Sequence, residues 1–173
     1  MYAKFYYITF INMKAQDIRY LVIHCSATRC NRPYSLAQMD RDHRARGFAG
    51  IGYHYYIRLN GDICALRARD EVGAHVRGYN RISLGICYEG GLNERGHAED
   101  TRTPEQKASL IKLLKWLHGF YPQAKIVGHR DLSPDKNGDG KIDAHEWVKL
   151  CPCFDASREY AYIEEGQKEV CDD

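Results

Sequence analysis

The fold of this chain is decided first by residues 18–25, which read IRYLVIHC. β-branched and aromatic residues favour a strand, and the polar Ser26-Ala27-Thr28 that follows is typical of a loop. His24 is therefore expected at the carboxyl end of a strand. A second histidine has the same placement, because residues 125–128 (KIVG) predict a short strand and His129 follows it directly.

Further strands are indicated by runs of apolar and aromatic residues that end at turn residues. The dipeptide Asn60-Gly61 lies between two of these runs and predicts a two-residue hairpin turn. The predicted strands cover residues 53–59, 62–66 and 82–88.

Helices are indicated by capping residues and by helical spacing of apolar positions. Ser35 with Gln38 predicts the start of a short helix that ends near Gly47. Thr103 and Pro104 start a longer one, with Gln106 completing a capping box and Gly119 near its end. Its core-facing positions are expected to be Ala108, Ile111, Leu114, Leu117 and His118, and a last helix is expected within residues 154–165.

These elements predict an α/β fold: one domain with a central mixed β-sheet flanked by helices. The length of 173 residues suits one core, so we divide the chain into an N-terminal extension (1–16), one domain (17–165) and a tail (166–173). The net charge of +2 is too small to support nucleic-acid binding by itself, and no apolar run is long enough for a membrane span. Seven cysteines, an odd number without a paired framework, favour reduced thiols.

Two strand-end histidines and a cysteine beside a proline are side chains that suit zinc. Three such ligands, His24, His129 and Cys151, would leave a fourth coordination position open for water or substrate, as in catalytic zinc sites. Taken singly, each of these residues is better explained by packing, because the long spacing between them matches no local motif. Cys153 offers a second thiol two positions after Cys151.

Five stretches occur in one order along the chain, and together they resemble the zinc-dependent N-acetylmuramoyl-L-alanine amidases of the phage-lysozyme type, which are relatives of the peptidoglycan recognition proteins. The stretches are VIHCSAT (22–28), GYHY (52–55), VGAHVRGYN (72–80), VGHRD (127–131) and KLCPCFD (149–155).

The resemblance implies a function and assigns roles to particular residues. It implies hydrolysis of the amide bond between the lactyl group of N-acetylmuramic acid and L-alanine, with zinc on His24, His129 and Cys151. The catalytic tyrosine of the family falls on Tyr53 and its catalytic lysine on Lys149. Substrate-binding residues are expected in the matching loop, at His75, Arg77 and Asn80. By strand alternation His54 should point away from Tyr53, so we leave it out of the site.

A departure from the family lies between His129 and Cys151. Residues 135–146 (DKNGDGKIDAHE) form a twelve-position calcium-loop pattern, although Ser133-Pro134 leaves little room for the usual entering helix. A turn that binds nothing is the alternative. The expected calcium ligands are Asp135, Asn137, Asp139, Lys141 through its carbonyl, Asp143 and Glu146.

Two other functions stay open from the sequence: a non-catalytic module that binds muramyl peptides, and a regulatory protein that contacts a partner. The resemblance implies that the binding-only relatives lack the cysteine ligand, so Cys151 favours the enzyme. We expect a monomer whose partner is peptidoglycan or a soluble muropeptide, with no nucleic acid and no membrane. Residues 1–12 do not resemble a signal peptide, so we expect cytoplasmic synthesis, with release by a holin or another route.

Overall fold

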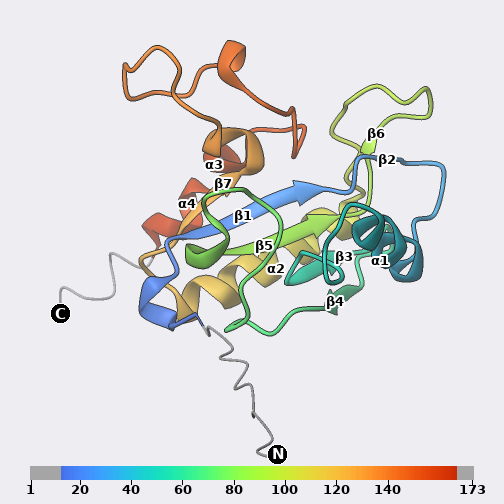
Figure 1. Ribbon diagram of the computed structural model, residues 1–173, viewed down its shortest axis with the longest axis horizontal. Helices are drawn as coiled ribbons and strands as arrows, with labels where there is room; N and C mark the ends of the chain where they lie inside the picture. The colour runs from blue at the N-terminus through green and yellow to red at the C-terminus, as the bar shows by residue number, and fades with distance from the viewer. Residues whose placement is uncertain (1–12, 167–173) are drawn as a thin grey trace, which may run out of the picture.

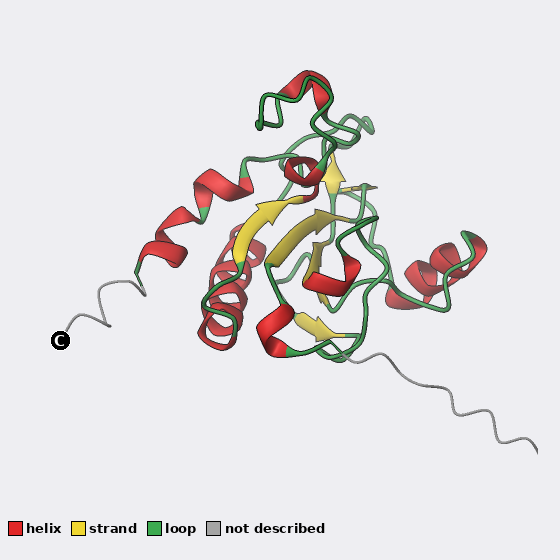
Figure 2. Cartoon of the chain, turned by 60° about the vertical axis from the view of Figure 1, so that its left-hand side comes forward, coloured by secondary structure: helices red, strands yellow, loops and turns green. Residues whose placement is uncertain are grey.

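The computed structural model describes residues 13–166 and contains one central sheet with helices on both sides (Figures 1 and 2). The sheet order is β4-β3-β5-β1-β7. Strands β1 (Tyr20–Cys25), β5 (Ser83–Tyr88), β7 (Lys125–Gly128) and β3 (Tyr55–Ile57) are parallel, whereas β4 (Ile63–Ala65) pairs antiparallel with β3. The predicted mixed sheet is therefore confirmed.

A second, smaller sheet was not foreseen from the sequence. It pairs β2 (Thr28–Arg29) in parallel with β6 (Gly91–Leu92), so the chain leaving β1 runs beside the chain leaving β5. Residues 13–166 also contain four short 3-10 helices: η1 (Ala15–Asp17), η2 (Asn80–Ile82), η3 (His129–Leu132) and η4 (Ala144–Glu146).

The longest helix, α2 (Pro104–Phe120), covers one face of the sheet and forms the main core with it. The capping box of Thr103 and Gln106 is present as predicted. The predicted core face is partly wrong, because Ala108 is exposed while Leu110 and Leu113 are buried beside Leu114 and Leu117.

Helix α1 (Leu36–Ala45) lies on the opposite side of the sheet, and Ser35 caps it as predicted. Its buried residues Met39 and His43 are one helical turn apart, and Met39 packs with Tyr56 and Cys87 in a second, smaller core. The predicted last helix is two short helices, α3 (Ala156–Glu159) and α4 (Ala161–Glu165).

The hairpin between β3 and β4 exists, but its predicted two-residue turn is wrong. The Arg58 N–H donates to the Asp62 carbonyl, and the Gly61 N–H donates to the Arg58 carbonyl, so three residues form the loop. Gly61 has a φ of 85°, which fits a type I turn followed by a residue in the left-handed region. The register is therefore one position away from the expected one, with Ile57 opposite Ile63.

The packed part of the chain includes residues that we assigned to an N-terminal extension. Met13 is buried in the main core, and its N–H donates to the Asp70 carbonyl at 2.6 Å.

Residues 1–12 and 167–173 lie outside the described part, as does Cys171; the six cysteines inside it are free thiols. None of the helices within residues 13–166 is long and apolar enough to cross a bilayer.

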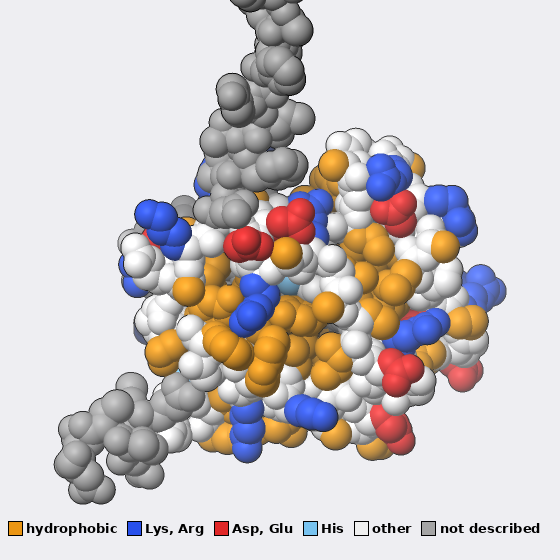
Figure 3. Space-filling view, turned by 90° about the horizontal axis from the view of Figure 1, so that it is seen from below, with side chains coloured by type: hydrophobic (Ala, Val, Ile, Leu, Met, Phe, Trp, Pro, Cys, Tyr) orange, Lys and Arg blue, Asp and Glu red, His pale blue; other side chains and the backbone are white. Residues whose placement is uncertain are grey.

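Aromatic side chains also reach the outer surface of α2. Trp116 and Phe120 are about half exposed, and the guanidinium of Arg69 lies 5.1 Å and 4.5 Å from their ring centroids. Hydrophobic side chains gather on the face shown in Figure 3, with basic side chains among them.

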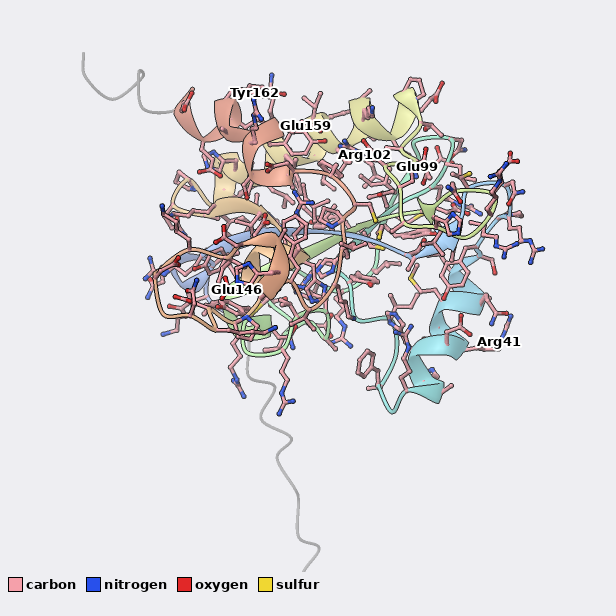
Figure 4. The ribbon with its side chains drawn as sticks, turned by 90° about the horizontal axis from the view of Figure 1, so that it is seen from above. Arg41, Glu99, Arg102, Glu146, Glu159 and Tyr162 are labelled. Carbon is pink, nitrogen blue, oxygen red and sulfur yellow. The ribbon has the colours of Figure 1, made fainter. Side chains whose placement is uncertain are left out.

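A buried arginine joins the C-terminal helices to the segment before α2 (Figure 4). Arg102 donates to both carboxylate oxygens of Asp100 and of Glu159 at 2.8–2.9 Å, and to the Tyr160 hydroxyl at 2.8 Å. Its guanidinium carbon lies 3.2 Å from the centroid of the Phe154 ring. Because the Arg102 side chain is only 1% exposed, water does not compete with the two carboxylates for its N–H groups.

A buried histidine, His54, connects the segment entering β3 to its neighbours. The Gly85 N–H donates to His54 Nδ1, and His54 Nε2 lies 2.9 Å from the Glu71 carbonyl oxygen. The ring is therefore neutral with its proton on Nε2, and burial lowers the pKa of His54 to about 4.

We expect Arg102→Met to lower the free energy of unfolding by about 2–3 kcal/mol, because it leaves two carboxylates facing each other without their cation. Urea denaturation measures the loss. Arg44→Met removes an exposed ion pair with Asp40 and should cost under about 0.5 kcal/mol. Equal losses in the two variants would contradict the structural role given to Arg102.

We expect His54 to make the metal-free protein less stable as the pH falls from about 6.5 to 4. In this window the unfolded chain binds a proton at His54 and the folded chain does not, so acid favours unfolding by up to about 3 kcal/mol. Urea titrations with a chelator present should show a smaller acid loss in His54→Asn than in wild type. Exposed His145→Asn should follow wild type; if His54→Asn does so too, the assignment is wrong.

Candidate functional site

The two strand-end histidines meet because β1 and β7 are adjacent and parallel. Ile23 pairs with Gly128, so the next residues, His24 within β1 and His129 directly after β7, lie side by side at this end of the sheet. Their Nδ1 atoms are 3.0 Å apart, and the rings are nearly perpendicular at 73°. His24 is buried, whereas His129 is half-buried at the edge of the pocket.

Cys151 reaches the histidines through a loop that the sheet holds in place. The Arg130 N–H donates to the Cys151 carbonyl, and the Tyr88 hydroxyl donates to the Pro152 carbonyl at 2.6 Å. Gly128 leaves room for this loop, because a Cβ there would lie 2.5 Å from Pro152 Cδ. Cys151 Sγ consequently lies 3.9 Å from His24 Nδ1.

These three ligand atoms are spaced as a metal requires. They all lie within 4.8 Å of one another, and no other group of histidine, cysteine or acidic side chains within residues 13–166 is arranged to hold a metal. Zinc bonds of about 2.0–2.3 Å in a tetrahedron place neighbouring ligand atoms about 3.3–3.7 Å apart. The set therefore fits a zinc ion with a free fourth position.

The second thiol of the Cys-Pro-Cys segment faces elsewhere. Cys153 Sγ lies 3.3 Å from the Gly91 carbonyl oxygen and 3.9 Å from Cys25 Sγ. It is not among the clustered ligand atoms, so the geometry favours Cys151.

The electrostatic setting favours neutral imidazoles, which is the form that binds a metal. Burial lowers the pKa of His24 well below its usual range, and the neighbouring His75, His129 and Lys149 add to this effect. Burial, followed by the charge of Lys149, lowers the pKa of His129 to about 4.

A pocket of about 470 Å³ opens over these ligands. Both predicted catalytic residues line it: Lys149 is exposed, and the ring centroid of Tyr53 lies 5.2 Å from that of His24. Burial raises the pKa of Tyr53 well above its usual value, and the nearby thiols of Cys87 and Cys151 add to the shift.

The predicted substrate-binding residues have three different settings in this pocket. Arg77 is exposed at the rim. Asn80 lines the pocket, but its Oδ1 accepts the backbone N–H groups of His75 and Val76. His75 contacts His24 directly, with 3.0 Å between His75 Nδ1 and His24 Nε2.

His54 does not line the pocket, as predicted, but strand alternation is not the cause. Strand β3 begins only at Tyr55, so strand alternation does not apply to Tyr53 and His54. His54 instead lies behind His75, with ring centroids 5.7 Å apart.

Sequence reasoning missed the side of the pocket that α1 provides. His43 is buried, its Nδ1 accepts the Gly52 N–H, and its ring centroid lies 5.4 Å from that of Tyr53. Arg46 and Phe48 line the same end. The helical spacing of Met39 and His43 was the signal that could have placed this histidine on the sheet-facing side.

The structure gives no support to the expected calcium site in residues 135–146. The carboxylates at its first and last positions already accept hydrogen bonds from the loop itself. Asp135 accepts the N–H groups of Gly138 and Gly140, and buried Glu146 accepts those of Lys136, Asn137 and Asp143. These backbone donors also lower the pKa of Glu146. The loop is a closed turn in which Glu146 points inward (Figure 4).

Comparison with known proteins agrees with this geometry. The model of the N-acetylmuramoyl-L-alanine amidase family matches residues 14–146. The endolysin of Enterobacteria phage K11 is 37% identical over 145 residues, which cover 84% of this chain and 87% of the endolysin. The solved N-acetylmuramoyl-L-alanine amidase LysC from Clostridium intestinale superimposes with a TM-score of 0.65 at 27% identity, covering 95% of each chain.

The peptidoglycan recognition proteins share the fold. Drosophila PGRP-LB superimposes with a TM-score of 0.64 at 21% identity, over 87% of this chain and 82% of that structure. The match of the family model to most of the domain and the similarity to the endolysin together show that this chain belongs to the N-acetylmuramoyl-L-alanine amidase family.

Proposed function

We propose that this chain is a zinc-dependent amidase that cleaves the bond between the lactyl group of N-acetylmuramic acid and L-alanine in peptidoglycan. The observation that carries the proposal is the cluster of His24, His129 and Cys151 at the base of a pocket in a member of this family. When bound there, zinc supplies a Lewis acid and lowers the pKa of a coordinated water to about 7.

Lys149 is suited to stabilise negative charge that develops on the substrate. Its side chain lines the pocket close enough to lower the pKa of both metal-binding histidines. A cation in this position favours the oxyanion that forms when the amide carbonyl is attacked.

Tyr53 is suited to donate a hydrogen bond rather than to accept a proton. Because burial raises its pKa, the phenol stays protonated near neutral pH. We therefore assign it the positioning of the substrate carbonyl or of the leaving amine, instead of the role of a general base.

The charge of the pocket suits a substrate that carries carboxylates. Arg46, Arg77 and Lys149 line it, and its lining, as far as the chain is described, contains no aspartate or glutamate. Stem peptides carry free carboxylates, which arginine binds well. All of these groups come from one chain, so we infer that the monomer is sufficient for activity.

The function is tested by digesting purified peptidoglycan and by measuring the zinc content of the protein. We expect one zinc per wild-type chain and release of L-alanine amino groups. Cys151→Ser should lose most of the zinc and activity, whereas Cys153→Ser should keep both. New reducing ends would identify a glycosidase. Binding of muropeptides without cleavage would identify a recognition module instead.

We expect Lys149→Met to lower kcat by about 100-fold to 1,000-fold while the zinc content stays at the wild-type level, because the variant loses only oxyanion stabilisation. Steady-state kinetics on a soluble muropeptide measures the change. Lys136→Met, at an exposed position of the inserted loop, is the matched control and should keep wild-type kcat. A Lys149→Met enzyme with unchanged kcat would remove this residue from the mechanism.

A further inference from the structure

His75, one of the three predicted substrate-binding residues, contacts the candidate metal ligand His24 through its ring. Its Nδ1 lies 3.0 Å from His24 Nε2, and the two rings are perpendicular, at 88°. His24 Nε2 is the nitrogen that faces away from the ligand cluster, because its Nδ1 faces His129 and Cys151. The contact is therefore behind the metal site rather than above it.

The protons in this contact have only one consistent arrangement when a metal is bound. If His24 binds the metal through Nδ1, its neutral ring carries the proton on Nε2. His24 Nε2–H then donates to His75 Nδ1, so His75 must carry its own proton on Nε2. That nitrogen lies 3.5 Å from Ser83 Oγ, and the Ser83 hydroxyl in turn donates to the Tyr79 carbonyl at 2.7 Å.

The ring of His75 has little room to take another orientation. A Cβ at Gly85 would lie 2.6 Å from His75 Cγ, and a Cβ at Gly73 would lie 2.5 Å from His75 Cδ2. The backbone of His75 is also fixed, because its N–H donates to Asn80 Oδ1. Two positions without side chains thus form a slot that fits an imidazole and holds its Nδ1 toward His24.

We propose that His75 is a positioning residue that directs His24 Nδ1 toward the metal by accepting the proton of His24 Nε2, and that it does not contact substrate in this role. The proposal rests on the proposed zinc site. A partner behind a metal-binding histidine fixes its tautomer and orientation, and loss of such a partner typically lowers metal affinity about 10-fold to 100-fold.

Two amide variants separate the hydrogen bond from packing. His75→Asn places an acceptor oxygen where Nδ1 lies, whereas His75→Gln places its amide near the position of Nε2. Zinc affinity of the folded full chain is measured by competition with a chromophoric chelator, together with the melting temperature of the metal-free protein. His43→Asn is the matched control, because His43 lines the same pocket and its ring Nδ1 accepts a backbone N–H from Gly52 rather than contacting a ligand.

We expect His75→Gln to bind zinc about 10-fold to 100-fold more weakly than wild type, and His75→Asn and His43→Asn to stay within about threefold of it. Two results would overturn the proposal. One is a His75→Gln variant that binds zinc as tightly as wild type; the other is a His75→Asn variant that binds zinc as weakly as His75→Gln. A raised KM for muropeptide at unchanged zinc affinity would return His75 to substrate binding. A wild-type chain that takes up no zinc would instead refute the proposed function on which this inference depends.

Discussion

The parallel pairing of β1 with β7 is the constraint on which the rest of the site depends. The two strands are distant in sequence, yet their register places His24 and His129 at the same edge of the sheet. Strand β1 is buried along almost its whole length between β5 and β7, so the position of His24 is set by the core and not by a loop. A metal site built on such strands needs little reorganisation when the ion binds.

The third candidate ligand, Cys151, depends on the same sheet in a less direct way. Cys151 lies in a loop, but Gly128 at the end of β7 admits Pro152, and Tyr88 of β5 binds the Pro152 carbonyl. Tyr88 itself belongs to the core that α2 covers. Packing of the main core therefore also fixes the position of Cys151, which contacts that core.

The sequence predicted the strands of the central sheet and the two capped helices, each from a local signal, and the clustering of His24, His129 and Cys151, from a family motif. It failed where distant contacts select between local alternatives. Asn60-Gly61 suits several turns, and the observed one places the Gly61 carbonyl where Ser109 of α2 donates to it at 2.6 Å. The acidic loop is a different case, because its contacts are local: it has the spacing of a calcium site, but Glu146 accepts hydrogen bonds from the backbone of its own loop, which spacing alone does not reveal. The contact of His75 with His24 joins residues 51 positions apart and has no signature in either segment.

The separation of the ligands along the chain has a consequence for folding as well as for chemistry. His24 and Cys151 are 127 positions apart, so one ion held between them ties the first strand of the sheet to the segment before the last helices. Because the three side chains come together only in the folded chain, the ion binds the folded state and not the unfolded one, and its binding free energy adds to the free energy of unfolding. An ion bound for catalysis would thus also stabilise the fold, because the domain must release it in order to unfold.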